Sequence, residues 1–131
     1  MAAQRPLALR FTRADRIKYG RYFSRVRQAG ERIATGCLVA NWLRLSADAR
    51  SRLGVITSGK LGGAVVRNRA RRLLRESFRL NQHQLAQPVD LVLVARASIL
   101  GKTFDQVERD LLITLRKARL LKEPTGQGQP S

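Results

Sequence analysis

The chain has 131 residues, a length that suits one domain with one hydrophobic core. It carries 26 Lys and Arg residues against 9 Asp and Glu, a formal net charge of +17. No apolar run approaches the roughly 18 residues of a membrane-spanning helix, and the N-terminus has no signal-peptide segment, so we expect a cytoplasmic protein without a membrane partner. With one Cys, Cys37, and one His, His83, the chain cannot form an intrachain disulfide, and a Cys/His zinc site is disfavoured.

The positive charge is concentrated in the first two thirds of the chain. Residues 1–89 hold 19 of the 26 basic residues and 4 of the 9 acidic ones. Most of the basic residues are Arg, whose planar donors match phosphate and whose guanidinium group can stack on bases. Nucleic acid is therefore the first hypothesis for a partner.

The first part of the chain predicts an arm, a helix and two strands. Residues 1–10 have the composition of a loose arm, and a helix is predicted at about 16–29, with Gly30 as its stop. Residues 37–45 and 53–58 are rich in strand-forming residues, and the polar residues 46–52 connect them. Cys37 is expected to be a small buried side chain.

The last part predicts a strand and a helix. Residues 89–97, which follow Pro88, give the strongest strand signal in the chain. Thr103 and Gln106 form a capping-box pattern that opens a helix, in which Phe104, Val107, Leu111, Leu115 and Ala118 repeat at helical spacing. We expect a single domain over 1–131, with its core at about 14–121 and flexible residues at 1–10 and 122–131. Three helices and a small sheet predict an α/β or α+β sandwich.

Residues 60–79, KLGGAVVRNRARRLLRESFR, hold six arginines that only Glu76 offsets. At about 100° per residue, a helix divides this segment into two sides. The polar side gathers Arg67, Asn68, Arg71, Arg72, Arg75 and Arg79, with Arg69 at its border. The apolar side, expected to face the core, gathers Val66, Ala70, Leu73, Leu74, Ser77 and Leu80. Because few acidic residues stand at i,i+4, repulsion favours a bound anion over a merely solvated charged face.

The loop before this helix is a second candidate anion site. Glycines such as Gly62 and Gly63 let backbone N–H groups approach a phosphate, and a helix N-terminus adds unpaired donors. The same glycines equally suit a turn from strand to helix. Residues 54–61, GVITSGKL, match a nucleotide-binding P-loop only in part, because Leu61 stands where Ser or Thr is needed for Mg²⁺, so nucleotide hydrolysis is disfavoured.

The segment from Lys60 to Arg79 closely resembles the RNR motif of the protein subunit of bacterial ribonuclease P. The resemblance extends over about residues 14–121. RIKYGRYFSRVRQAG, from residue 16, is similar to the family's first helix; LGVITSGK, from residue 53, to the strand before the motif; and DLVLVARAS, from residue 90, to the later strand.

The resemblance implies a two-layer α/β (α+β) sandwich of the ribosomal protein S5 domain 2-like class, with about four strands, three helices and a left-handed β-α-β crossover. It implies a subunit that binds the catalytic RNA of ribonuclease P and the 5′ leader of precursor tRNA, and that assists Mg²⁺-dependent endonucleolytic removal of this leader. The chemistry and the Mg²⁺ would belong to the RNA. We therefore expect no catalytic residue, metal site or cofactor in the protein alone, and one protein per RNA.

Site residues follow from the same resemblance. The family's RNA-contacting motif maps onto Lys60, Arg67, Asn68, Arg69, Arg71, Arg72 and Arg75. Phe23 matches an aromatic residue of the central cleft that can pack on an unpaired leader nucleotide. Arg27 and Asn41 are further leader-cleft candidates, although they stand where relatives often have aromatic residues. Trp42 and Tyr22 are alternative sources of a stacking surface.

Three other functions fit parts of the sequence. A structural RNA-binding protein of the ribosomal type, without a role in cleavage, fits the charge and size equally well, and only the motif separates the two. A metal-dependent protein nuclease needs convergent carboxylates, whereas Asp15, Asp48 and Glu76 are far apart in sequence. A DNA-binding module is disfavoured because no helix-turn-helix, zinc-finger or zipper pattern accompanies the charge.

Overall fold

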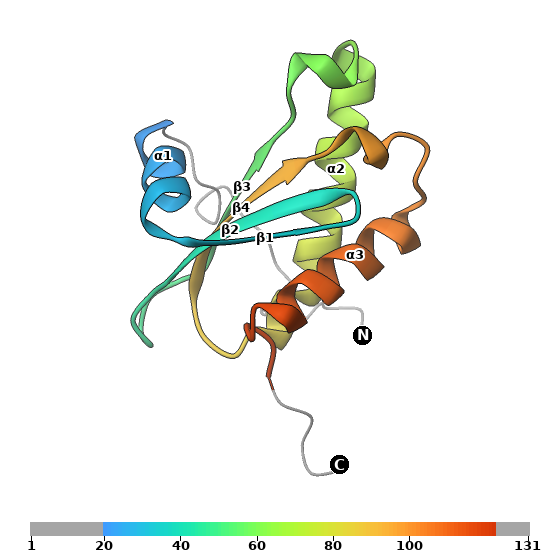
Figure 1. The fold of residues 1–131 in the computed structure, drawn as a ribbon. Coiled ribbons are helices and arrows are strands. Elements are labelled where there is room, and N and C mark those ends of the chain that lie inside the picture. The colour runs from blue at the N-terminus through green and yellow to red at the C-terminus, as the bar shows by residue number, and fades with distance from the viewer. Residues whose placement is uncertain (1–19, 123–131) are drawn as a thin grey trace, which may run out of the picture.

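The computed structural model describes residues 20–122, with side chains from residue 23 onwards (Figure 1). The predicted arm, the predicted start of the first helix before residue 20 and the C-terminal tail lie outside the described residues. No described helix is long and apolar enough to cross a membrane. The elements in chain order are α1 (Gly20–Ala29), β1 (Glu31–Thr35), β2 (Leu38–Arg44), β3 (Arg52–Ile56), α2 (Ala64–Asn81), β4 (Val89–Ala95) and α3 (Phe104–Lys117).

The strands form one mixed sheet in the order β1-β2-β4-β3. β2 pairs antiparallel with β1 and β4, whereas β3 pairs parallel with β4. β4 is buried on both faces, which fits its almost continuous apolar sequence, VDLVLVA. α2 supplies the crossover that the parallel pair requires. The α+β class is thus confirmed, and the left-handedness of the crossover stays a prediction.

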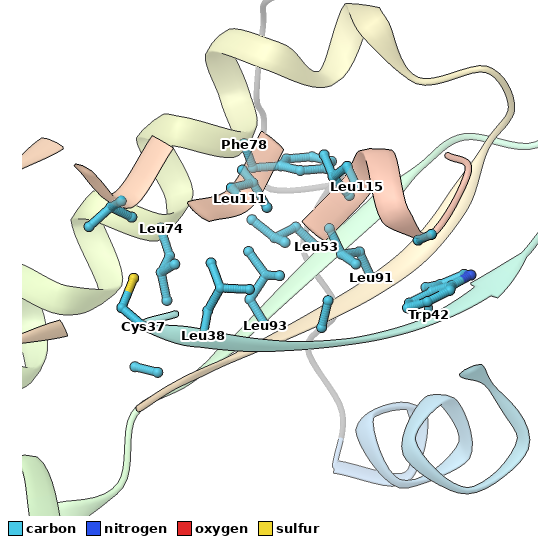
Figure 2. Close-up of a cluster of buried hydrophobic side chains, with 14 of the residues drawn as sticks. Cys37, Leu38, Trp42, Leu53, Leu74, Phe78, Leu91, Leu93, Leu111 and Leu115 are labelled. Atoms are coloured by element: carbon cyan, nitrogen blue, oxygen red, sulfur yellow. The ribbon is translucent and has the colours of Figure 1, made fainter. Parts of the chain in front are cut away.

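The two faces of the sheet carry different helices. α2 and α3 cover one face, where the main core includes Leu38, Leu74, Leu93 and Leu111 (Figure 2). α1 lies against the opposite face (Figure 1), where Val26 and Val92 form a smaller apolar cluster. Because successive strand side chains point to opposite faces, each central strand contributes to both clusters.

The predicted capping box of α3 is present. The backbone N–H of Gln106 donates to the Thr103 hydroxyl oxygen at 3.2 Å, and the backbone N–H of Thr103 donates to Oε1 of Gln106 at 3.0 Å. Val107, Leu111, Leu115 and Ala118 are buried as predicted. This arrangement fixes where the last helix begins and which side faces the sheet.

β1 is the strand that no strand pattern in the sequence located. It pairs with β2 through a tight turn in which Gly36 has a φ of 56°, a left-handed conformation that favours glycine. Next to it, the backbone N–H of Cys37 donates to Oδ2 of Asp110 at 3.0 Å. The hairpin is therefore attached directly to α3.

Cys37 is fully buried, which confirms the expectation from sequence. Burial, together with the hydrogen bond and negative charge of Asp110, raises the pKa of the Cys37 thiol from 9.0 to about 12. The thiol is thus protonated at neutral pH and is a weak nucleophile.

We predict that Cys37→Ala changes how stability depends on pH. Below pH 9 the thiol is protonated in both the folded and the unfolded chain, and the variant should lose about 1 kcal/mol through the cavity. Between pH 9 and about 12 only the unfolded thiol ionises, so the wild type loses stability as the pH rises. By pH 10 it should have lost roughly 1.4 kcal/mol relative to the variant, measured by urea unfolding at pH 8 and pH 10. An equal difference at both pH values would contradict the raised pKa.

Candidate nucleic-acid interface

α2 begins directly after the predicted glycine pair. Gly62 has a φ of 141°, so the turn into the helix requires a glycine at this position. The Ser58 hydroxyl accepts a hydrogen bond from the backbone N–H of Lys60 at 3.2 Å and shapes the short 3₁₀ turn Gly59–Leu61. Gly63 is the N-cap and offers no side chain to the first turn of α2. The structure thus shows that Gly62 is needed for the turn from β3 into α2. Anion binding by the loop stays a prediction.

The buried side of α2 differs in phase from the prediction. Its buried residues are Ala70, Leu74, Ser77, Phe78 and Asn81. Phe78, which the prediction assigned to neither side, is 1% exposed, whereas Val66, predicted to be core, is 37% exposed. On a helical wheel of 100° per residue, the centre of the observed buried side therefore lies roughly 50° closer to the arginines than the centre of the predicted apolar side. The reason is that α2 packs against α3 as well as against β3 and β4.

The first turn of α2 borders an apolar pocket of about 470 Å³ that the sequence did not predict. Val65 and Val66 line it from α2, and Leu100 lines it from the loop after β4. Val65 is 82% exposed, so the loop does not close over this turn of the helix. Val66 consequently faces an open pocket instead of the core.

Two arginines of α2 are oriented by neutral oxygen atoms. The Arg71 guanidinium donates to Oδ1 of Asn68 at 2.6 Å and to the Thr57 hydroxyl oxygen at 2.7 Å. On the other flank, Arg69 donates to the backbone carbonyl of Lys102 at 2.9 Å. These contacts orient the side chains without neutralising their charge, and they give Asn68 a defined role in positioning Arg71.

The other arginines of α2 differ in exposure and in their partners. Arg72 is exposed, and Arg67 is half-buried, with its Nε atom shielded from solvent and without a hydrogen-bond partner among the described residues. Arg79 forms an ion pair with Glu76 at 2.8 Å. Within the part of the chain that the structure describes, Arg67, Arg69, Arg71 and Arg72 form no ion pair with a carboxylate. A pocket of about 320 Å³ on this side of α2 is lined by Asn68, Arg71, Arg72, Arg75 and Glu76.

A second polar pocket, of about 390 Å³, lies between α1, β1 and β2. It is lined by Ser24, Arg27, Gln28, Arg32 and Asn41. The three α1 residues stand at i, i+3 and i+4 and so share one side of that helix. Arg32 of β1 is the direct partner of Asn41 across the β1–β2 pair. The structure thus brings the two leader-cleft candidates Arg27 and Asn41 to one pocket and adds Arg32.

The predicted aromatic residue of the cleft lies beside this pocket, not in it. Phe23 is half-buried and packs on the apolar cluster of Val26 and Val92. Its ring fills the space above Gly54, where an added Cβ would lie 2.5 Å from Cε1 of Phe23. Trp42 is 2% exposed and belongs to the core on the opposite face, so it cannot replace a stacking residue here. The Tyr22 side chain lies outside the described residues.

The end of β3 connects the two basic regions. Thr57, which holds Arg71, directly follows Ile56, and Ile56 packs on the apolar cluster beneath α1. The arginine side of α2 and the face covered by α1 are therefore neighbours around the edge strand. Neither Thr57 nor Arg32 was found by sequence reasoning, because their roles depend on strand pairing and helix placement.

The acidic residues do not form a catalytic cluster within residues 20–122. No three His, Cys, Asp or Glu side chains among these residues come close enough to hold a metal ion. Asp48 accepts a hydrogen bond from Ser46 in the β2–β3 loop, and Glu76 pairs with Arg79 on α2. Asp15 lies outside the described residues.

A mixed sheet bordered by an arginine-rich crossover helix defines a basic α+β protein of the nucleic-acid-binding class. The family model for ribonuclease P matches residues 11–119. The chain therefore belongs to the ribonuclease P protein family.

Curated relatives and solved structures agree with this membership. The ribonuclease P protein component of Gluconacetobacter diazotrophicus is 39% identical over 81% of this chain and 92% of its own length. That of Chloroflexus aurantiacus is 38% identical over 88% of this chain and 85% of its own length. The Staphylococcus aureus RNase P protein superposes with a TM-score of 0.75 at 29% identity, covering 84% of this chain and all of that chain. The Thermotoga maritima RNase P protein gives a TM-score of 0.70 at 27% identity, covering 78% of this chain and 96% of that chain.

We predict that Gly54→Ala destabilises the protein because the new methyl group collides with Phe23. Overpacking of this kind costs about 1–3 kcal/mol. Phe23→Leu in the same chain should recover part of the loss, which a double-mutant cycle of urea unfolding measures. Gly59→Ala is the control, since a Cβ there meets nothing within 4 Å. Equal losses for Gly54→Ala and Gly59→Ala would refute the contact.

Proposed function

We propose that this chain, as the protein subunit of ribonuclease P, binds the RNA subunit through α2 and the 5′ leader of precursor tRNA through the face covered by α1. The observation that carries the proposal is the arginine side of α2, where no carboxylate of residues 20–122 forms an ion pair with Arg67, Arg69, Arg71 or Arg72.

Phosphate binding by α2 follows from the chemistry of its side chains. The pocket lined by Arg71, Arg72 and Arg75 offers several guanidinium groups to one anion, and bidentate pairs of Arg with phosphate are strong. Arg71 is held in place by Asn68 and Thr57, which lowers the entropy lost on binding. We assign Lys60, Arg67 and Arg69 to the same RNA-binding surface.

Leader binding is assigned to Phe23, Arg27 and Asn41. Phe23 gives a half-buried ring beside the polar pocket, and single-stranded RNA commonly stacks its bases on aromatic side chains. Arg27 is exposed and can hold a leader phosphate or lie flat on a base.

The proposed chemistry belongs to the RNA. Among the described residues no three metal-ligating side chains come together, and we assign the Mg²⁺ of the reaction to the RNA of the holoenzyme. The protein then contributes affinity for the substrate and neutralises phosphate repulsion. One protein per RNA is proposed. The alternative, a structural RNA-binding protein of the ribosomal type, is disfavoured by the family membership.

Reconstitution tests the proposal directly. We expect the protein to stimulate cleavage of precursor tRNA by a bacterial ribonuclease P RNA at Mg²⁺ concentrations that leave the RNA alone nearly inactive. The rate of leader release is measured with and without protein, and mature tRNA serves as the competitor. Tight binding to the RNA without any stimulation would favour the structural alternative.

We predict that Arg72→Ala reduces the salt dependence of RNA binding. Loss of one phosphate contact should lower the log–log slope of affinity against salt by about 0.7–0.9, and the affinity should fall with it. Arg109→Ala, which removes one exposed charge from α3, is the matched control and should change the slope less. If both variants give the same slope, the effect is one of net charge, and α2 is not the contact surface.

A further inference from the structure

The exposed large apolar side chains of the described chain gather at one place. Within residues 23–122 these side chains are Val65, Val66 and Leu100, which are 82%, 37% and 48% exposed. All three line the pocket of about 470 Å³ beside the first turn of α2. Single exposed apolar residues are common on protein surfaces, whereas a cluster of them around a concave site indicates a place where a ligand binds.

This pocket is preformed by the core beneath it and by the loop after β4. Leu61, Ala70 and Ile99 also line it, and each of them is buried in the main core. The loop is held in shape, because the backbone N–H of Lys102 donates to the carbonyl oxygen of Ile99 at 3.1 Å and Gly101 turns the chain with a φ of 81°. The volume lies within the range of roughly 300–1,000 Å³ that small-molecule sites occupy.

One cationic side chain completes the apolar lining. Arg69 lines the pocket from α2, and its guanidinium group donates to the backbone carbonyl of Lys102 in the loop at 2.9 Å. Among the described residues this is its only hydrogen bond, and no carboxylate pairs with it, although a guanidinium group has five N–H donors. Arg69 is therefore held beside the pocket and keeps its charge and most of its donors for an anion.

From this geometry we infer that the pocket binds a small organic carboxylate, whose hydrocarbon body contacts Val66 and Leu100 and whose carboxylate group pairs with Arg69. An aliphatic lining favours a hydrocarbon body, because burial of each methylene group is favourable, whereas unpaired bases are usually bound by aromatic side chains. A single guanidinium group matches a single carboxylate in a bidentate pair. The inference goes beyond the proposed function, which uses Arg69 but not the pocket.

Occupation of the pocket has a consequence for RNA binding. Arg69 also belongs to the proposed RNA-binding surface, and a guanidinium group that pairs with a carboxylate offers fewer donors and less charge to a phosphate. The bound carboxylate should therefore weaken RNA binding. This consequence, unlike the site itself, rests on the proposed function.

The test uses the full-length protein, with octanoate as the probe and the backbone amide signals of NMR spectra as the readout. Octanoate should shift the signals of Val65, Val66, Leu100 and Gly101 in a saturable way. Each methylene group that is removed between octanoate and butanoate should weaken binding by about threefold. Octanol has the same chain length without the charge, and it should bind about fivefold more weakly than octanoate.

Three variants separate the charge, the apolar lining and the net charge of the protein. Arg69→Gln should lower the affinity for octanoate to that for octanol and leave octanol binding unchanged. Leu100→Ser should weaken the binding of both probes by about fivefold and keep the wild-type melting temperature, because Leu100 is 48% exposed. Arg109→Gln, which removes an exposed charge of α3 that does not line the pocket, is the matched control and should change neither affinity.

A second measurement follows the effect on RNA. Octanoate at a saturating concentration should weaken the binding of a bacterial ribonuclease P RNA to the wild-type protein. Leu100→Ser should bind the RNA as the wild type does, and its RNA affinity should respond less to the same octanoate concentration.

The outcomes distinguish this inference from the proposed function. Shifts spread over the whole surface, an affinity that does not depend on chain length, or equal octanoate affinities of Arg69→Gln and the wild type would overturn the site. The site would also be overturned if the RNA, or a second copy of the protein at high concentration, shifts these amide signals while octanoate does not. Octanoate binding that leaves the RNA affinity unchanged would support the site and contradict the RNA role of Arg69. Failure to stimulate precursor cleavage would overturn the proposed function and leave the site in place.

Discussion

The parallel pairing of β3 with β4 is the constraint on which the position of the arginine side of α2 depends. Parallel neighbours cannot be joined by a tight turn, so the chain must cross over, and α2 is that crossover. β4 is buried on both faces at the centre of the sheet, which fixes the end of the crossover in the core. An arginine-rich segment that would otherwise extend into solvent is thereby held as one side of a rigid helix beside the edge strand (Figure 1).

Burial allows α2 to carry this charge without a bound anion. Leu74 and Phe78 are fully buried, and each such side chain contributes roughly 1.5–3 kcal/mol. Repulsion between like charges at i,i+4 on an exposed helix costs only a few tenths of a kcal/mol per pair. At its C-terminal end, the Asn81 amide donates to Glu108 of α3 at 2.8 Å, which ties the two helices together. The cationic side is therefore preformed, and binding does not have to pay for folding the helix.

Sequence reasoning found the elements whose pattern is local and missed features that depend on packing. The capping box at Thr103 and the apolar run of β4 act within a few residues, so both were predictable. β1 has only five residues with alternating polar character, and it becomes a strand because β2 and the Gly36 turn pair with it. A helical wheel gives the angles between residues but not the direction of the sheet, which is why Val66 was wrongly predicted to face the core. The depth of Asn41 and the contact of Arg71 with Thr57 likewise require the assembled sheet.

The turn at Gly36 has a consequence for how the molecule is made. A Cβ at Gly36 would lie 2.2 Å from Oδ2 of Asp110, the same oxygen that accepts the hydrogen bond from the Cys37 backbone. The first hairpin is thus completed by a carboxylate that the ribosome adds 73 residues after Cys37. During synthesis the Cys37 N–H can therefore bond only to water until the last helix has emerged and docked. The β1–β2 hairpin and α3 therefore complete their folding together. A nascent chain truncated before Asp110 lacks the hydrogen bond that attaches this hairpin to α3.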